Sequence, residues 1–289
     1  MSTAGFRELR VITPAAWLAR DLATGTDLRV AHDYGLDAPA DTSRTAWWAP
    51  HKFIARLAVT PGVTQPGLAS PGAAWMTTLD PRWARRGLWS GPLSDVADST
   101  LWAPNGALVF AKVAEIKLGR LQASVYSTAA AFLAAAGQAG VQPASQVVLS
   151  GAVAFTDEYR CFVAPGPDGE PVVVASSAYL IGDVTWDFWE DAAGAPDTNA
   201  AVLFAQRVLD DPATVGPAGY VIDVGRLADG SWAVVEPNAS WSSNPYHCDP
   251  TGVVRSILAA QDPAGDRRWA WTSDPAIDRY ARPLPVRTT

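Results

Sequence analysis

The chain has 289 residues, of which 48% are hydrophobic and 18% are charged, and its formal net charge is −7 at pH 7. This length and composition are typical of a globular protein with one large domain or two to three smaller lobes, and they exclude a disordered chain. The negative net charge gives no electrostatic basis for binding a phosphate backbone, so we expect no nucleic-acid partner.

The N-terminal hundred residues predict a small α/β lobe. The expected elements are a strand at residues 6–12, a helix from Pro14 to about Asp21, a strand at 27–31 and a strand at 53–59. Residues 33–50 are rich in Asp, Ala, Pro and Thr, which favours a loop, and the Pro/Gly-rich residues 61–71 predict a connection.

Three arginines, Arg82, Arg85 and Arg86, lie close together between Asp80 and Gly91, beside two tryptophans. One interpretation is a cationic patch for an anionic substrate, because the guanidinium group suits carboxylate recognition. The alternative is a solvated helix edge with the aromatic rings packed beneath it, which is the more common arrangement for charged residues.

The middle of the chain alternates between strand and helix patterns. The expected elements are a strand at 107–113, an alanine-rich helix at 127–139, a short buried strand at 146–149 and a strand at 156–163. Lys112 lies near the end of the first strand. Glu158 and Arg160 are two residues apart, so they share one face of the last strand. The alternative for this pair is a surface ion pair that contributes less than about 1 kcal/mol.

The remaining elements lie after residue 170. They are a strand at 172–179, an acidic loop at 186–199, a helix at 200–209, a loop at 240–250 and a helix at 252–260. The Pro- and Arg-rich tail at 262–289 is expected to wrap the surface. Three aromatic residues of the acidic loop, Trp186, Phe188 and Trp189, are candidates to line a substrate entry.

Residues 219–238 carry the strongest signal in the chain. Asp229-Gly230 lies between two apolar, β-branched runs, which predicts a β-hairpin. If these two residues form a two-residue loop, Asp223 lies directly opposite Glu236. Side chains at such positions are about 5 Å apart at Cβ, and like charges there destabilise the sheet.

Asn238 lies on the same strand face as Glu236, so two carboxylates and an amide oxygen converge. A divalent cation would offset the repulsion, and an all-oxygen ligand set suits Mg²⁺ or Mn²⁺. The alternative is a solvated sheet face. Against it, the same pairing places the apolar residues Val221, Trp232 and Val234 on this face.

An aspartate on one strand, followed after a turn by Glu-x-Asn on the next, resembles the metal-binding signature of the ATP-grasp superfamily. Residues 234–249 (Val-Val-Glu-Pro-Asn-Ala-Ser-Trp-Ser-Ser-Asn-Pro-Tyr-His-Cys-Asp) resemble one branch, the arginine-to-lysine clade. The resemblance covers about residues 105–260. It implies that ATP binds together with Mg²⁺ or Mn²⁺, and that the metal ligands are Asp223, Glu236 and Asn238.

The resemblance also implies a nucleotide site. Its residues would be Lys112, Lys117 and Arg160 for the phosphates, Glu158 for the ribose hydroxyls, and the backbone of a hinge at Ser150, Gly151 and Val153 for the adenine edge. Lys112 and Arg160 are the implied catalytic residues. Two features depart from the wider family: Gly119 is the single glycine where many members have a glycine-rich flap, and Val221 replaces a basic residue. If Arg160 and Lys117 do not supply that charge, a degenerate, non-catalytic member is the alternative.

The implied fold class is α+β: an ATP-grasp fold in which two α/β lobes grip ATP, preceded by a small N-terminal α/β lobe. We expect the N-terminal region at residues 1–104, the central lobe at 105–150, and the C-terminal lobe with the metal site at 151–289.

The implied activity is that of an ATP-dependent carboxylate–amine (or carboxylate–thiol) ligase, which activates an acid as an acyl phosphate for attack by an amine. Its partners would be small-molecule carboxylates and amines. Three alternatives stay open: a kinase on the same scaffold, a nucleotide-binding protein without turnover, and a Trp-rich ligand-binding module. P-loop, Rossmann, zincin and hydrolase-elbow motifs are absent.

The location of the protein is predicted from three features of the sequence. No run approaches the roughly 20 apolar residues of a membrane helix. The N-terminal residues lack the apolar core of a signal peptide. Two cysteines, Cys161 and Cys248, are too few for a disulfide framework. We therefore expect a cytoplasmic protein that does not bind a membrane.

Overall fold

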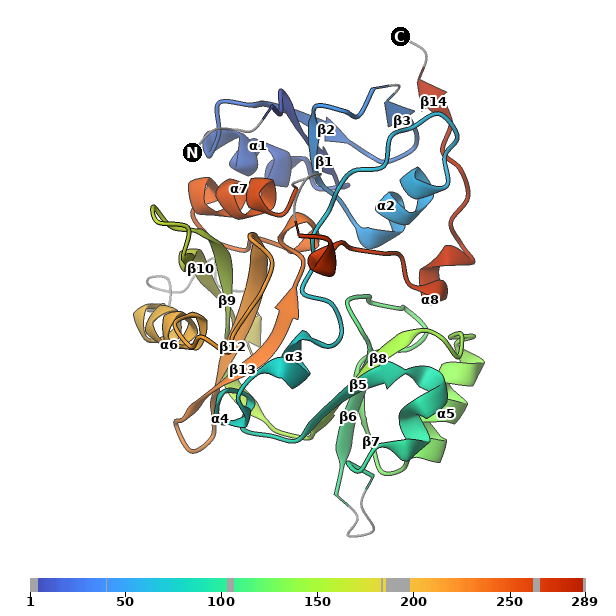
Figure 1. The fold of residues 1–289 in the computed structure, drawn as a ribbon, viewed down its shortest axis with the longest axis vertical. Helices are drawn as coiled ribbons and strands as arrows, with labels where there is room; N and C mark the ends of the chain where they lie inside the picture. Colours follow the sequence, from blue (N-terminus) through green and yellow to red (C-terminus); the bar gives the residue numbers. More distant parts are fainter. Residues whose placement is uncertain are drawn as a thin grey trace.

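The computed structural model describes residues 5–39, 41–102, 107–182, 184–185, 198–261 and 266–287. In these residues, three larger β-sheets form the centres of three packed bodies (Figure 1). No helix in these ranges is long and apolar enough to cross a membrane. The aromatic candidates Trp186, Phe188 and Trp189 lie outside the described residues.

The N-terminal body is built on a parallel sheet of order β2-β1-β4. Its elements are β1 (Glu8–Ile12), α1 (Ala16–Thr24), β2 (Arg29–Asp33), β3 (Ala38–Pro39), β4 (Thr45–Trp48) and α2 (His51–Ala58). The expected loop at 33–50 was therefore wrong in part, because it contains β3 and β4. All four residues of β4 are buried, so packing of Trp47 and Trp48 against the core overrides the polar composition around them.

The expected strand at 53–59 was also wrong, because these residues form α2. Phe53, Ile54 and Leu57 are buried, and this spacing follows the helical period of 3.6 residues and not the period of two. The charged residues Lys52 and Arg56 are four apart on the other face. The helix starts directly after Pro50, whose extended backbone is suited to a helix N-terminus.

The central body is an antiparallel sheet of order β5-β8-β6-β7. Its elements are β5 (Leu88–Pro92), a 3₁₀ turn at Leu93–Asp98, β6 (Val109–Val113), β7 (Ser124–Tyr126), α5 (Ala129–Gln138) and β8 (Gln146–Gly151). The expected strands and helix of this region are confirmed. Helix α5 packs Phe132 and Ala136 into the core of this body. The sheet includes β5 and therefore begins before residue 105, which is the expected first residue of the central lobe.

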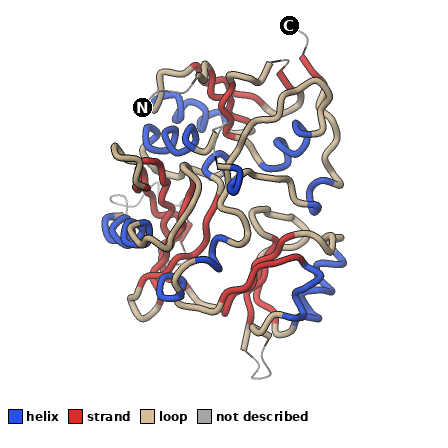
Figure 2. Tube along the Cα trace, in the orientation of Figure 1, coloured by secondary structure: helices blue, strands red, loops and turns tan. Residues whose placement is uncertain are grey.

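The C-terminal body is a sheet of order β11-β10-β9-β12-β13. Its elements are β9 (Phe155–Pro165), β10 (Pro171–Ile181), β11 (Val184–Thr185), α6 (Asn199–Leu209), β12 (Tyr220–Leu227), β13 (Trp232–Asn238) and α7 (Pro250–Ala259), with a 3₁₀ turn at Ser240–Ser242. Two short helices, α3 (Trp75–Thr78) and α4 (Pro81–Ala84), lie against it in the connection from the N-terminal body. Figure 2 shows the two antiparallel sheets as separate groups of strands.

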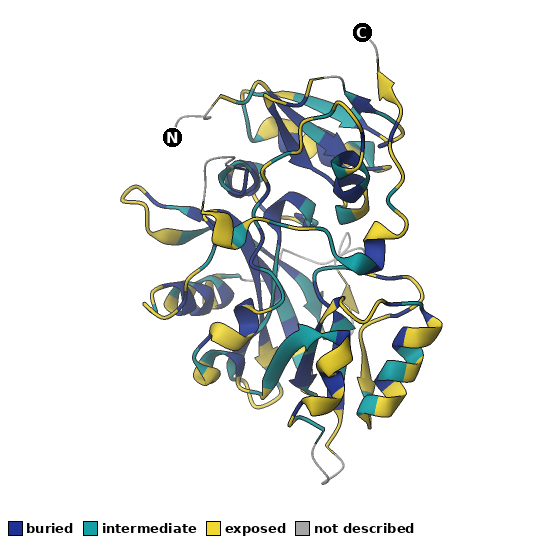
Figure 3. Cartoon of the chain, turned by 45° about the vertical axis from the view of Figure 1, so that its right-hand side comes forward, coloured by how far each residue is buried: buried dark blue, intermediate teal, exposed yellow. Residues whose placement is uncertain are grey.

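The two faces of the C-terminal sheet are covered differently. Helix α6 packs against one face, where Cys161, Ile222 and Val224 point. Helix α7 covers one end of the other face, over Phe162 and Val221, and also contacts α1 of the N-terminal body. Farther along that second face the buried side chains become polar. Figure 3 shows buried residues in the strands of the sheets and exposed residues on outer helices and loops.

The hairpin at β12 and β13 confirms the pairing of Asp223 with Glu236, but by a different route from the expected one. The Leu227 N–H donates to the Ser231 carbonyl, so the loop has three residues, and its third, Gly230, has a left-handed φ of 81°. The pairing is therefore one residue out of the expected register near the loop. A β-bulge at Val235 then shifts it back before Glu236.

This bulge corrects a second expectation. Because the register changes between Val234 and Glu236, Val234 and Trp232 turn to the opposite face and pack with Ile222 and Val224. They do not share the face of Asp223, as the simple alternation predicted.

The C-terminal tail runs back over all three bodies. Its elements are a 3₁₀ turn at Arg267–Trp269, α8 (Pro275–Asp278) and β14 (Val286–Arg287). Helix α8 buries Ala276 and Ile277 against the central body, and β14 pairs in parallel with β3. The tail thus packs on the other parts of the chain over its described length.

Candidate functional site

A cavity of about 740 Å³ lies between the central sheet and the uncovered end of the C-terminal sheet. Nearly all the site residues predicted from the sequence line it. They are Lys112, Lys117, Ser150, Gly151, Val153, Glu158, Arg160, Glu236 and Asn238. The exception is Asp223, which is fully buried and lies behind Arg160.

Arg160 and Asp223 face each other across the β9–β12 pair. The Arg160 guanidinium donates from Nε and Nη2 to the two carboxylate oxygens, at 2.9 and 2.7 Å, and from Nη1 to the Asn244 carbonyl at 3.1 Å. This bidentate geometry is that of an ionised pair. Burial by itself lowers the pKa of Arg160, but the carboxylate outweighs it and raises the pKa above its ordinary value. Arg160 is therefore a permanent positive charge at the cavity wall.

Lys112 and Glu236 form a second ion pair, which joins the central sheet to the C-terminal sheet. Burial raises the pKa of Glu236, but Lys112, Asn238 and Arg160 outweigh it and lower the pKa to about 2. Glu236 is thus ionised at neutral pH. The pair crosses the cavity, so it links the two lobes directly.

The two carboxylates and Asn238 fit a divalent cation. The Asn238 Nδ2 atom donates to one oxygen of Asp223 at 3.0 Å and to one oxygen of Glu236 at 3.1 Å. One oxygen of each carboxylate therefore lies about 3 Å from the same amide nitrogen. A cation that bridges these two oxygens would take the place of this nitrogen, with the amide turned so that its oxygen faces the cation. Arg160 donates to both oxygens of Asp223, including the one that accepts from Asn238. Lys112 donates to the other oxygen of Glu236.

The other predicted nucleotide contacts surround this centre. Lys117 is exposed at the cavity edge and Ser150 is buried. At the hinge, the N–H groups of Gly151 and Ala152 already donate to the Gly87 and Leu108 carbonyls, at 3.0 and 3.2 Å. An adenine edge would therefore meet other groups of this segment.

Glu158 accepts a hydrogen bond from the Tyr179 hydroxyl, and burial raises its pKa. Tyr179 and Tyr246 were not predicted from the sequence. Their rings stack at 5.2 Å, and the Arg160 guanidinium carbon lies 5.5 and 5.1 Å from the two ring centres. The two rings thus form an aromatic wall against the permanent cation. No local signal marks these tyrosines, because β10 and the loop after β13 meet only in the folded chain.

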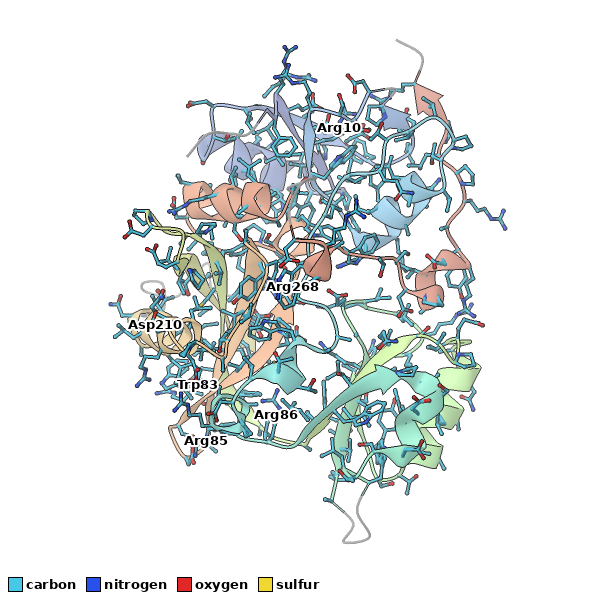
Figure 4. All side chains as sticks on the ribbon, in the orientation of Figure 1. Arg10, Trp83, Arg85, Arg86, Asp210 and Arg268 are labelled. Carbon is cyan, nitrogen blue, oxygen red and sulfur yellow. The ribbon has the colours of Figure 1, made fainter. Side chains whose placement is uncertain are left out.

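Arg86 is a further residue whose position the sequence did not reveal. It lines the cavity, and its guanidinium donates to the carbonyls of Val234 and Val235, both at 2.7 Å. These carbonyls lie at the β-bulge that returns Glu236 to its pairing with Asp223. Burial lowers the pKa of Arg86 to about 10. Arg82 and Arg85 instead pair with Asp211 and Asp229, as in the solvated-edge interpretation. Figure 4 labels Arg85 and Arg86.

We expect Arg86→Ala to lower the free energy of unfolding by about 2–3 kcal/mol, because it leaves two carbonyls of the bulge without their donor. Urea denaturation measures this change. The neighbouring variant Arg85→Ala is the matched control and should change stability by less than about 0.5 kcal/mol, because its ion pair at 3.8 Å is exposed. Equal losses in both variants would contradict a specific role for Arg86.

A cavity between two lobes, with two carboxylates and an amide opposite lysine and arginine, on an α+β scaffold, defines an ATP-grasp fold. Residues 40–257 match the model of family 3 of the arginine-to-lysine clade of ATP-grasp domains, and the chain belongs to this family.

Solved structures resemble the chain at low identity. A D-cycloserine synthetase is 14% identical, with a TM-score of 0.49 over 87% of this chain and 98% of that chain. A carboxyaminoimidazole ribonucleotide synthase from Aspergillus clavatus, complexed with ATP, is 12% identical, with a TM-score of 0.49 over 90% and 78%. A D-alanyl-alanine synthetase A from Vibrio cholerae is 10% identical, with a TM-score of 0.45 over 89% and 98%. A comparison with curated proteins found no match.

Proposed function

We propose that the protein is an ATP-dependent ligase that activates a small carboxylic acid as an acyl phosphate and joins it to an amine. Membership of the ATP-grasp family supports the use of ATP. The observation that carries the proposal is the pattern of charge at the cavity: Arg160 pairs with Asp223, and Lys112 pairs with Glu236. Such alternating charges suit a triphosphate together with a divalent cation.

In this proposal Asp223, Glu236 and Asn238 hold Mg²⁺ or Mn²⁺, which would supply positive charge to the nucleotide phosphates. The Lys112 ammonium group leaves Glu236 and contacts the phosphates. Arg160 stays on Asp223 and presents its remaining N–H groups to the transferring phosphoryl group. Lys117, at the edge, adds a further cation, and Glu158 accepts hydrogen bonds from the ribose hydroxyls.

The chemistry needs no protein nucleophile. The acid's carboxylate attacks the terminal phosphorus of ATP, and ADP leaves. An amine then attacks the carbonyl carbon of the acyl phosphate, and inorganic phosphate leaves as the amide forms. The acyl phosphate hydrolyses in water, so the site must keep water out while it exists. The apolar rings of Tyr179 and Tyr246 beside Arg160 are placed to do this.

A screen for ADP release tests the proposal. Carboxylic acids and amino acids are supplied singly and in pairs with Mg-ATP, and Glu236→Gln is the blank. ADP release that requires both an acid and an amine supports a ligase. Release with an acid or alcohol alone favours a kinase. A Mg-ATP-dependent rise in melting temperature with no turnover would instead indicate a nucleotide-binding protein. Activity unchanged in Glu236→Gln would contradict the proposed metal site.

A further inference from the structure

A second cavity, of about 310 Å³, adjoins the proposed ATP cavity. Its walls come from four separate segments: residues 70–73 after the N-terminal body, 114–116 after β6, Ala144 and Gln146 at the start of β8, and the tail between 268 and 275. The tail wall lies beyond residue 257, where the match to the family ends. This cavity is therefore partly built by a segment outside the family match. Figure 4 labels Arg268 on this wall.

Glu115 lines both cavities and is the only carboxylate of the described residues that does so. Its backbone has a φ of 55°, in the left-handed region that non-glycine residues seldom adopt. Its carboxylate accepts a hydrogen bond from the Ser70 hydroxyl. Residues in such strained conformations concentrate at functional sites. The strained backbone therefore holds a carboxylate at the junction of the two cavities.

Charged groups face Glu115 from both of the cavities that it lines. Lys112 of β6 lies on the ATP side, and Asp274 of the tail lies on the other side, where it accepts hydrogen bonds from the Gln146 and Ala276 N–H groups. Arg268 also lines the second cavity, but it is exposed and paired with Asp266. Burial raises the pKa of Glu115 to about 7, and Lys112 opposes this rise.

The wall around Glu115 and Asp274 therefore carries two carboxyl groups, and it also has polar side chains. Ser273 lies in this wall, and its Oγ is buried without a hydrogen-bond partner among the described residues. Among the described residues that line this cavity, Glu115 and Asp274 are the two carboxylates, and no buried cation lies between them. Such a lining favours a small cationic ligand, and the volume suits a compact one.

We propose that this second cavity is the acceptor subsite for a small primary amine, and that Glu115 accepts the proton that the amine must lose. This inference rests on the proposed ligase function. It adds the class of acceptor and the residue that activates it.

The amine enters as an ammonium ion, and one of its protons moves to the Glu115 carboxylate. The lone pair so freed attacks the carbonyl carbon of the acyl phosphate, where the C–N bond forms and the C–O bond to phosphate breaks. The departing phosphate takes a second proton from the nitrogen and leaves as hydrogen phosphate. Glu115 returns its proton to water after the product has left.

The first test compares two nucleophiles in Glu115→Gln. Hydroxylamine at high concentration is uncharged at pH 8 and needs no base, so it traps any acyl phosphate as a hydroxamate. The common amino acids serve as amine probes, and the best of them is used for comparison. We expect the ratio of amide to hydroxamate formed to fall about 100-fold in Glu115→Gln, the lower end of what a general base contributes.

The pH profile gives a second readout from the same variant. In the wild-type protein, kcat/KM for the amine should rise with pH through about 7, because the ionised form of Glu115 is the base. In Glu115→Gln this inflection should be lost, and the rate should rise only where the free amine loses its proton. An unchanged ratio and an unchanged profile would overturn the role of Glu115.

The cavity itself is tested by filling it. Thr272 lines only the second cavity and is exposed, so Thr272→Trp should fold and narrow the subsite. We expect KM for the amine to rise at least tenfold, with a much smaller change in KM for ATP. Thr24→Trp, at the exposed end of α1, is the matched control and should change neither.

The outcomes separate the two proposals. If the wild-type protein forms no hydroxamate with any acid, the ligase function itself fails. If hydroxamate forms but Thr272→Trp leaves KM for the amine unchanged, the function stands and the subsite is wrong.

Discussion

Replacing Arg160 by Met is expected to lower the free energy of unfolding by about 3–5 kcal/mol, which is the usual cost of leaving one partner of a buried ion pair alone. Asp223 is fully buried, and both of its oxygens accept from Arg160. Burial already raises the pKa of Asp223, and Arg160 opposes this rise. Urea denaturation at pH 7 measures the loss.

A double-mutant cycle separates the energy of the Arg160–Asp223 ion pair from the effect of removing either side chain alone. Arg160→Met with Asp223→Leu removes both charges, so this double variant should be more stable than Arg160→Met alone. The loss in Arg160→Met should also shrink at low pH. Without Arg160 the pKa of Asp223 rises further, and a raised pKa gives stability at low pH that is lost as the pH rises through it. If the loss of stability in Arg160→Met were the same at low pH and in the double variant, Arg160 would act only by filling space.

Replacing Lys112 by Met is expected to reduce Mg-ATP turnover by about 10²- to 10³-fold, the usual effect of removing one preorganised donor to a developing charge. Lys112 is the residue of the central sheet that contacts Glu236 across the cavity. Its loss removes a phosphate contact and leaves Glu236 without its partner. Steady-state ADP release, with the acid and amine found in the screen, measures the change.

Lys117→Met is the matched control, because Lys117 lines the same cavity but is exposed at its edge. A solvated cation at the cavity edge should matter less, and we expect a loss below about tenfold. The opposite order of effects would show that Lys117 is the main phosphate ligand and that Lys112 is mainly an anchor for Glu236.

The hairpin of β12 and β13 was predicted correctly in its pairing but not in its details. Alternation and the Asp-Gly signal were enough to pair Asp223 with Glu236. A two-residue loop was expected, whereas the chain uses a three-residue loop and a bulge. The two differences cancel at Glu236 but not at Val234, which turns to the other face. A bulge leaves no mark in composition, so the sequence could not reveal it.

The fold of the N-terminal body was predicted less well. Residues 51–58 have a short apolar pattern that suits either a strand or a helix. The helix α2 forms because this conformation buries Phe53, Ile54 and Leu57 together on one side. The strand β4 was hidden in a polar stretch, because its burial depends on distant residues. The backbone N–H of Trp47, for example, donates to the side-chain oxygen of Gln261, more than 200 residues later in the chain.

The sequence by itself determined the family and the position of the hairpin, and it predicted acidic, amide and cationic side chains that the fold gathers at one cavity. These follow from local periodicity and from the order of residues that resembles the family. Only the tertiary structure decided that Arg86 donates to the bulge, that two tyrosines flank Arg160, and that Glu115 lies between two cavities. Each of these depends on segments far apart in the chain, and such contacts arise only when the bodies pack together. No local pattern specifies them.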